Sequence, residues 1–334
     1  MRRRAVLRAD AGGPVGFGHF VRTVALASYL RDDFDCVVTG HTPDGVLSQW
    51  QLDEIAAAGA RPLPIAASGL KEFDALFLDT LGPDDIAVLD NYYFDAHYQS
   101  AARERCAALV CIDDTHDRRF TADAVVSFCP LPREKFNLAP YTRLYTGLGW
   151  AFLRAPFLSP APPRVSTGAP RRIMTAIGGT DPLGLTAKIC RVISEVFPEA
   201  EIHLPGDCDS HIDSRLSTVR HGRLDAAGMA RLMNSCDLGV FPASTLCVEA
   251  ISRRLPVVAG WFVDNQRDFY EAGTASGWMG ALGSLLDPPD LIEARLREAT
   301  AAGLPSPPDI DFAAARRQVA ETFNSLIEIN PYLS

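Results

Sequence analysis

The chain has 334 residues, of which 47% are hydrophobic and 22% charged, a composition typical of a globular protein long enough for two domains. Its formal net charge of −9 argues against a nucleic-acid-binding surface, which would carry a basic stripe. No apolar run approaches the roughly 18 residues that a membrane span requires, so we expect none.

The sequence also argues against a signal peptide and against a metal site. The N-terminal Met-Arg-Arg-Arg is basic like the start of a signal peptide, but Arg8 and Asp10 break the next apolar run, so we expect a cytoplasmic protein. The eight cysteines form no C-x-x-C pair, as is typical of reduced core residues. The histidines lack the spacing of zinc ligands, so we expect no metal and no other cofactor.

The first half alternates short apolar runs with helical patterns, which indicates a parallel sheet covered by helices. A proline-rich stretch at 156–170 interrupts this alternation and predicts a linker after an N-terminal domain of residues 1–155. The strands predicted before it span residues 4–9, 35–39, 61–66, 85–90, 107–112 and 124–128.

The second half repeats the pattern, which predicts a C-terminal domain of residues 171–281 and then a helical tail at 282–334. The fold class expected is α/β, with two Rossmann-like domains that face a cleft, the usual place for a small-molecule site. Strands are predicted near 172–177, 200–204, 237–241 and 255–260, and helices near 225–234, 245–253 and 265–275.

The stretch Val15-Gly16-Phe17-Gly18-His19 places an imidazole on a glycine-rich turn between the first predicted strand and a helical pattern over 20–30. In open α/β sheets, ligands bind at such carboxyl ends of strands. Gly16 and Gly18 would let backbone N–H groups approach an anion, and Arg22 follows one helical turn later.

Neither well-known phosphate loop fits this stretch. A dinucleotide fingerprint needs glycine where Val21 stands, and a Walker-type loop needs Lys and then Ser or Thr where the chain has His19 and Phe20. A plain glycine turn with its histidine packed against the sheet remains the structural alternative.

A second candidate site follows the strand predicted near 237–241. Ser244 and Thr245 are N-cap types, and with Leu246 they would offer free N–H groups and a positive helix end to the diphosphate of a nucleotide. Glu249 lies one turn further on the same face, where it would accept hydrogen bonds from ribose hydroxyls. Taken alone, a capped helix with a solvated glutamate explains the motif equally well.

Three further features of the second half are candidates for substrate binding. Gly178, Gly179, Thr180 and Asp181 form a glycine loop with a hydroxyl and a carboxylate beside its N–H groups. Asn265 and Gln266 precede a helix, where amides suit sugar hydroxyls and plain capping alike. Leu224 completes the set of predicted substrate-binding residues.

Acidic residues also end two strands of the first half. Asp90 and Tyr92 would supply a carboxylate and a phenol to the cleft. Asp113 and Asp114 end the next strand, where paired acids are more often turn formers and caps than catalysts.

These motifs occur together in the order found in one family, and the chain resembles it over residues 4 to about 277. The family is the UDP-2,4-diacetamido-2,4,6-trideoxy-β-L-altropyranose hydrolases of pseudaminic acid biosynthesis, which are similar to GT-B glycosyltransferases. The resemblance implies a GT-B-like fold with a UDP-sugar bound between the domains. Asn91, where the family often has His, and Val248 leave the identity of the hexose open.

The sequence therefore suggests an inverting hydrolase in which water attacks the anomeric carbon and UDP departs. His19 would be the base, because an unperturbed imidazole pKa of about 6.5 suits proton removal near neutral pH, and Asp90 and Tyr92 would assist it. Helix N-termini would support UDP without a metal. The alternatives are a GT-B transferase, in which a sugar hydroxyl replaces water, and a non-catalytic nucleotide-sugar-binding protein; the oligomeric state is left open.

Overall fold

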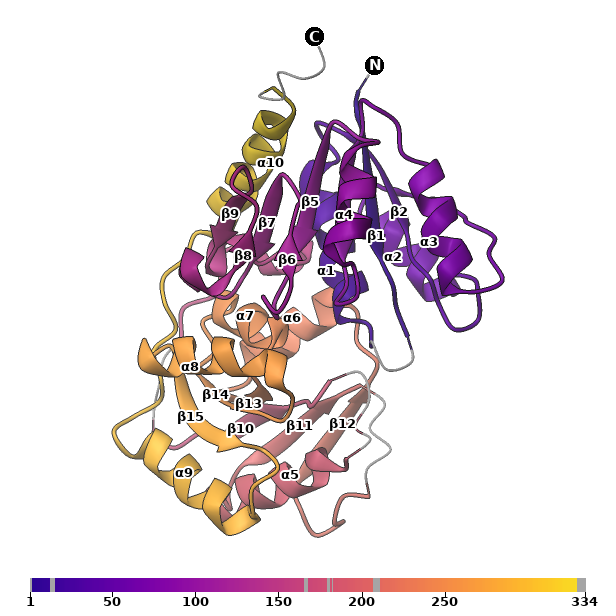
Figure 1. Cartoon of the computed structure of the whole chain (residues 1–334). Coiled ribbons are helices and arrows are strands. Elements are labelled where there is room, and N and C mark those ends of the chain that lie inside the picture. Colours follow the sequence, from indigo (N-terminus) through magenta and orange to yellow (C-terminus); the bar gives the residue numbers. More distant parts are fainter. Residues whose placement is uncertain are drawn as a thin grey trace. The chain divides into compact units, whose positions relative to one another are not determined.

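The computed structural model in Figure 1 describes residues 2–12, 16–164, 168–178, 181, 183–206 and 211–328. Gly179 and Thr180 lie outside the described residues. The chain divides into two compact units, the first formed by Met1–Arg154 with Asp311–Ser334 and the second by Ala155–Ile310. None of the described helices is long and apolar enough to cross a membrane.

The first unit is built on a parallel sheet with the strand order β3-β2-β1-β4-β5-β7-β9. Its chain runs outward from β1 to β3 and then resumes at β4 on the other side of β1, so the strand order reverses between β1 and β4. The carboxyl ends of two such strands form a crevice where ligands bind in open α/β sheets. The strands are β1 (Arg4–Ala9), β2 (Asp35–Thr39), β3 (Arg61–Pro62), β4 (Ile86–Asp90), β5 (Ala108–Ile112), β7 (Ala124–Ser127) and β9 (Arg143–Thr146).

Helices cover this sheet because its central strands are apolar on both faces. Every residue of β4 and β5 is buried, as a doubly covered parallel strand requires. Two short strands, β6 (Arg119–Phe120) and β8 (Asn137–Leu138), pair separately. The helices of the unit are α1 (Gly18–Leu30), α2 (Gln49–Ala57), α3 (Leu70–Asp79), α4 (Ala96–Arg103) and α10 (Phe312–Glu328).

The second unit has a parallel sheet with the order β12-β11-β10-β13-β14-β15, which reverses between β10 and β13. Its strands are β10 (Arg172–Thr175), β11 (Glu201–Pro205), β12 (Thr218–Gly222), β13 (Leu238–Pro242), β14 (Val257–Trp261) and β15 (Met279–Ser284). Its helices are α5 (Leu185–Val196), α6 (Ala226–Ser235), α7 (Thr245–Ser252), α8 (Arg267–Ala275) and α9 (Pro289–Ala301). Single-turn helices span Arg133–Lys135 and Leu148–Trp150 in the first unit, and Ala155–Phe157 and Asp264–Gln266 in the second.

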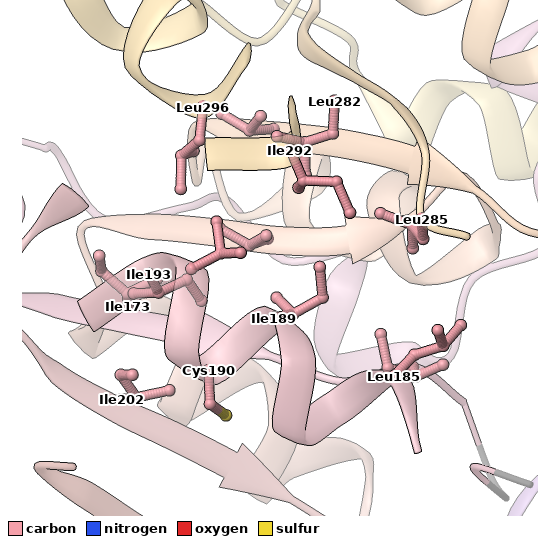
Figure 2. Close-up of a cluster of buried hydrophobic side chains, with 14 of the residues drawn as sticks. Ile173, Leu185, Ile189, Cys190, Ile193, Ile202, Leu282, Leu285, Ile292 and Leu296 are labelled. Carbon is pink, nitrogen blue, oxygen red and sulfur yellow. The ribbon is translucent and has the colours of Figure 1, made fainter. Parts of the chain in front are cut away.

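The core of the second unit contains branched aliphatic side chains between its sheet and helices α5 and α9 (Figure 2). The cluster contains Ile189 and Ile193 of α5, Ile173 of β10 and Leu296 of α9. All four side chains are fully or almost fully buried. Burying each stabilises the unit by about 1.5 to 3 kcal/mol relative to exposure to water.

The structure corrects the expected tail at 282–334. Residues 282–284 complete β15, and α9 packs against α5 and β15 within the second unit. Helix α10 instead packs against α1 of the first unit, where Arg316 donates to the carbonyl of Ser28 at 3.0 Å. The apolar faces of α9 and α10 are thus buried on different units, a separation that local periodicity cannot reveal.

Other boundaries also differ from the prediction. In the expected linker, Arg164 donates to the carbonyls of Met233, Cys236 and Arg253, so this part is fastened to the second unit. The strand predicted at 61–66 shortens to β3, where prolines lack the N–H that a ladder needs. Edge strands β9 and β12 were missed because they carry several polar residues and have no fully buried position.

Candidate active site

Helix α1 begins directly after the glycine-rich turn and carries three polar side chains toward the sheet. Gly16 has φ +70°, a left-handed conformation that glycine adopts without strain, and its carbonyl accepts a hydrogen bond from the N–H of Gly12 at 2.8 Å. Gly18 has no such requirement and is the first residue of α1. Spacings of three and four residues place His19, Arg22 and Thr23 on one face of the helix, and all three are buried.

This helix face meets Asp90, the last residue of β4, which is fully buried. Its Oδ1 accepts hydrogen bonds from Nδ1 of His19 and Nη2 of Arg22, both at 2.6 Å. Its Oδ2 accepts from Nε of Arg22 at 2.7 Å and from the hydroxyl of Thr23 at 2.9 Å. One carboxylate therefore receives four hydrogen bonds from α1, and the two from Arg22 form a bidentate pair.

The charges of this cluster stabilise one another. Burial by itself would raise the pKa of Asp90, but attraction to Arg22 and His19, together with their hydrogen bonds, lowers it below its usual range. Burial likewise opposes the charge of Arg22, but Asp90 and Asp114 raise the pKa of its guanidinium well above the ordinary value. Asp90 is therefore ionised at neutral pH.

An ionised Asp90 fixes the tautomer of His19. A carboxylate can only accept, so Nδ1 of His19 must carry the proton, and in the neutral imidazole Nε2 then has the free lone pair. Nη2 of Arg22 lies 3.0 Å from the same Nδ1, and the two are donors that converge on one oxygen of Asp90. Nε2 of His19 thus has a free lone pair, and the hydrogen bond from Nδ1 to Asp90 fixes the orientation of the ring.

The loop after β5 supplies a second carboxylate. Oδ2 of Asp114 accepts from Nη1 of Arg22 at 2.8 Å and from the phenol of Tyr92 at 3.5 Å. The ring of Tyr92 meets the ring of His19 edge to face, with centroids 4.5 Å apart. Asp113 has a different task, because it accepts from the backbone N–H groups of Thr115 and His116 and so shapes the turn.

In the second unit, the predicted residues other than Leu224 follow three neighbouring strands, β10, β13 and β14. After β13, the hydroxyl of Ser244 accepts from the N–H of Leu246 at 3.3 Å and caps α7, whose residue Glu249 is buried and not solvated. After β14, Oε1 of Gln266 accepts from the N–H of Phe262 at 3.0 Å, and Asn265 lies in the same helical turn. Thr245 begins α7.

The loop after β10 differs from the expectation of an open array of donors. Asp181 accepts from the N–H groups of Leu185 and Thr186, both at 2.8 Å, so a carboxylate of the chain itself already caps the start of α5. Gly178 is exposed and has φ +140°. Leu224 lies just before α6, at the end of the chain segment that follows edge strand β12.

The structure thus joins His19, Asp90, Tyr92 and Arg22 in one cluster of the first unit. It also brings in Thr23 and Asp114, which were absent from the predicted site. The signal for Thr23 was its spacing of four residues from His19, and the signal for Asp114 was its place after the strand next to β4. No group of three or more metal-ligating side chains was found among the described residues.

Comparisons with known proteins find neither a matching family model nor a matching curated protein. Solved structures do match over almost the whole chain. MurG of Acinetobacter baumannii has a TM-score of 0.58 at 14% identity, over 98% of this chain and 99% of its own. The chain has a GT-B-like fold with two Rossmann-like units. The spinosyn forosaminyltransferase SpnP (TM-score 0.58, 14% identity, 99% and 96% covered) and a glycotransferase of kitacinnamycin (0.57, 11%, 98% and 96%) share it.

Replacing Asp90 should test its part in holding the first unit together. Asp90→Asn leaves Arg22 buried without its main counter-charge, so we expect the free energy of unfolding to fall by about 3 kcal/mol. Asp35→Asn is the matched control, because its ion pair with Arg61 is exposed and should contribute less than about 1 kcal/mol. Urea unfolding would measure both, and equal losses would contradict the assignment.

The free energy of unfolding should fall at acid pH partly because the carboxylate of Asp90 becomes protonated. Because folding lowers the pKa of Asp90, its contribution is complete above the unfolded value of about 3.9 and is lost as the pH falls from there toward the folded value. Between about pH 5 and pH 3, wild-type protein should therefore lose more stability than Asp90→Asn. Urea unfolding at several pH values would check this, and parallel curves would argue against it.

Proposed function

We propose that the protein is a nucleotide-sugar hydrolase that cleaves the anomeric C–O bond of a UDP-sugar with inversion. The observation that carries this proposal is the buried pair of His19 and Asp90, in which the carboxylate holds Nδ1 and leaves Nε2 as a base. The pair lies where the strand order reverses between β1 and β4, the usual place for ligands in such sheets.

In the proposed reaction, His19 activates a water molecule. Nε2 takes one proton from the water molecule while the water oxygen forms a bond to the anomeric carbon. At the same time, the bond from that carbon to the diphosphate oxygen breaks. The electron pair of the broken bond leaves with UDP. The imidazolium that forms is stabilised by the negative charge of Asp90, which is ionised before the step begins. Attack opposite to the leaving group inverts the anomeric configuration in one displacement.

The departing diphosphate needs electrostatic support, for which α7 is the better candidate in the second unit. The N-cap of α7 is a neutral serine, so the positive end of the helix dipole is not neutralised by a carboxylate of the chain at that position. At α5, Asp181 already accepts from two N–H groups of the first turn. We therefore assign the diphosphate to Ser244, Thr245 and Leu246, with Glu249 further along α7 for the ribose.

The choice of sugar rests on the sequence. Because the sequence resembles hydrolases of a UDP-linked diacetamido-trideoxyhexose, we propose that sugar as the substrate. The reaction would then belong to a cytoplasmic pathway to pseudaminic acid. Three similar solved structures support the broader proposal of nucleotide-sugar chemistry, since two bear the names of glycosyltransferases and the third is MurG. A transferase that uses the same base on an acceptor hydroxyl is the second candidate, and the names of these structures favour it.

Removing the base should separate catalysis from nucleotide binding. His19→Asn should lower turnover of the diacetamido UDP-sugar by about two to four orders of magnitude, the usual contribution of a general base. Calorimetry should find UDP affinity nearly unchanged, because the proposed UDP contacts come from the second unit. His97→Asn changes an exposed histidine on α4 and should retain wild-type turnover. An equal loss of UDP affinity in His19→Asn would refute the proposed division of tasks.

Reaction in ¹⁸O-labelled water should distinguish the hydrolase from its alternatives. We expect the label in the released sugar and none in UDP, with the inverted anomer seen by proton NMR before mutarotation. Label in the β-phosphate would mean P–O cleavage, and a retained anomer would mean a covalent intermediate. Turnover only after an acceptor alcohol is added would establish the transferase instead.

A further inference from the structure

The loop after β4 carries two consecutive tyrosines, Tyr92 and Tyr93, whose side chains make contacts on opposite faces of the sheet. Asp90 pairs in register with Ala9 of β1, so Asp90 faces α1, whereas Arg8 and Asp10 point to the other face. Tyr92 turns toward His19 on the α1 side. Tyr93 turns the other way, and its phenol contacts both Arg8 and Asp10.

Arg8 and its partners form a rigid polar cluster on this second face. The guanidinium is fully buried, lies over the rings of Phe73 and Phe94 at 4.8 Å from each centroid, and donates to the phenol of Tyr98 at 2.6 Å. Asp10 and Asp74 supply its counter-charges. A charge enclosed in this way has little freedom to move, because few other positions satisfy its hydrogen bonds.

Tyr93 ties the loop to this cluster. Its phenol donates to Oδ2 of Asp10 and accepts from Nη2 of Arg8 at 3.0 Å. On the other side of Tyr92, the carbonyl of Asn91 accepts from Nη1 of Arg118 at 2.9 Å, and Arg118 also binds Asp113. Both chain neighbours of Tyr92 are therefore bonded to charged side chains, of which Arg8 is fully buried and Arg118 partly buried.

The side chain of Tyr92 contacts both Asp114 and His19. It is 37% exposed, and its phenol reaches Asp114 only at the long distance of 3.5 Å. Its ring meets that of His19 edge to face, and the place of the ring follows from where the backbone of the loop lies. The proposed reaction leaves the buried Arg8 and Asp10 without a task.

We propose that Tyr93, anchored on Arg8 and Asp10, is a positioning residue that holds the ring of Tyr92 against His19. Tyr93 acts through its neighbour and does not itself meet the substrate. The catalytic part of this inference rests on the proposed function, whereas the placement of Tyr92 against His19 is measurable without any reaction.

Tyr93→Phe removes the anchoring hydroxyl and keeps the ring. If Tyr92 then shifts from His19, kcat should fall about tenfold or more with KM changed by less than about threefold, since a small misplacement at a reacting centre can lower the rate a hundredfold. In a Tyr92→Ala background the same substitution should add less than about twofold, because residues that act as one unit are not additive. Tyr141→Phe, which removes a phenol bonded to the carbonyl of Thr121 in the same unit, should leave kcat within about twofold.

NMR of ¹³C-labelled histidine provides the readout that needs no activity. The ring current of Tyr92 shifts the Cε1–H signal of His19. This signal is assigned as the one that is missing from the spectrum of His19→Asn. That signal should move in Tyr93→Phe toward its position in Tyr92→Ala and stay in place in Tyr141→Phe. If UDP-sugars are not turned over at all, the proposed function fails, but this shift still tests the anchoring.

Two results would overturn the inference: an unchanged His19 signal in Tyr93→Phe, or an equal loss of kcat from Tyr93→Phe with and without Tyr92. Should Tyr93→Phe fail to fold, Asp10→Asn weakens the same anchor, because it removes the charge that accepts from the phenol of Tyr93 and keeps the size of the side chain. The same shift and the same loss of additivity are expected, and their absence in that variant counts against the inference.

Discussion

A single buried carboxylate, that of Asp90, organises the first unit around its site. A charge fully removed from water is tolerated only when its oxygens are satisfied, and here all four hydrogen bonds come from one face of α1. The carboxylate thereby fixes the helix against β4 and sets the tautomer of His19 in the same contact. Stability and the proposed base share one interaction, so a change at Asp90 affects both.

Arg22 extends this constraint to the next strand. Its guanidinium joins Asp90 at the end of β4 to Asp114 after β5, two carboxylates that would otherwise repel across neighbouring strands. Asp113 pairs with Arg118, but burial and the charge of Asp114 together still raise the pKa of this carboxyl. The loops that carry Tyr92 and Asp114 are thus held by the buried Arg22 and the partly buried Arg118.

The second unit offers a different kind of chemistry, based on helix ends. Asp181 and Ser244 both cap helices, but one is an anion and the other is neutral, so of these two helices α7 is the one proposed to hold the diphosphate. The glycine loop and the serine motif looked comparable as sequence patterns. The capping contact of Asp181 distinguishes them, and it involves N–H groups four and five residues away.

Local periodicity by itself determined much of this protein. Alternating apolar runs identified the central strands of both sheets, because buried parallel strands need uninterrupted apolar residues, and helical spacing placed His19 and Arg22 on one face. Only the tertiary structure decided what those side chains meet. Asp90 lies 71 residues from His19, and Asp114 lies 92 residues from Arg22. Helix α10 belongs to the first unit, although in the sequence the whole second unit precedes it. Such partners depend on which strands become neighbours and where the chain crosses, and no short window of sequence contains that information.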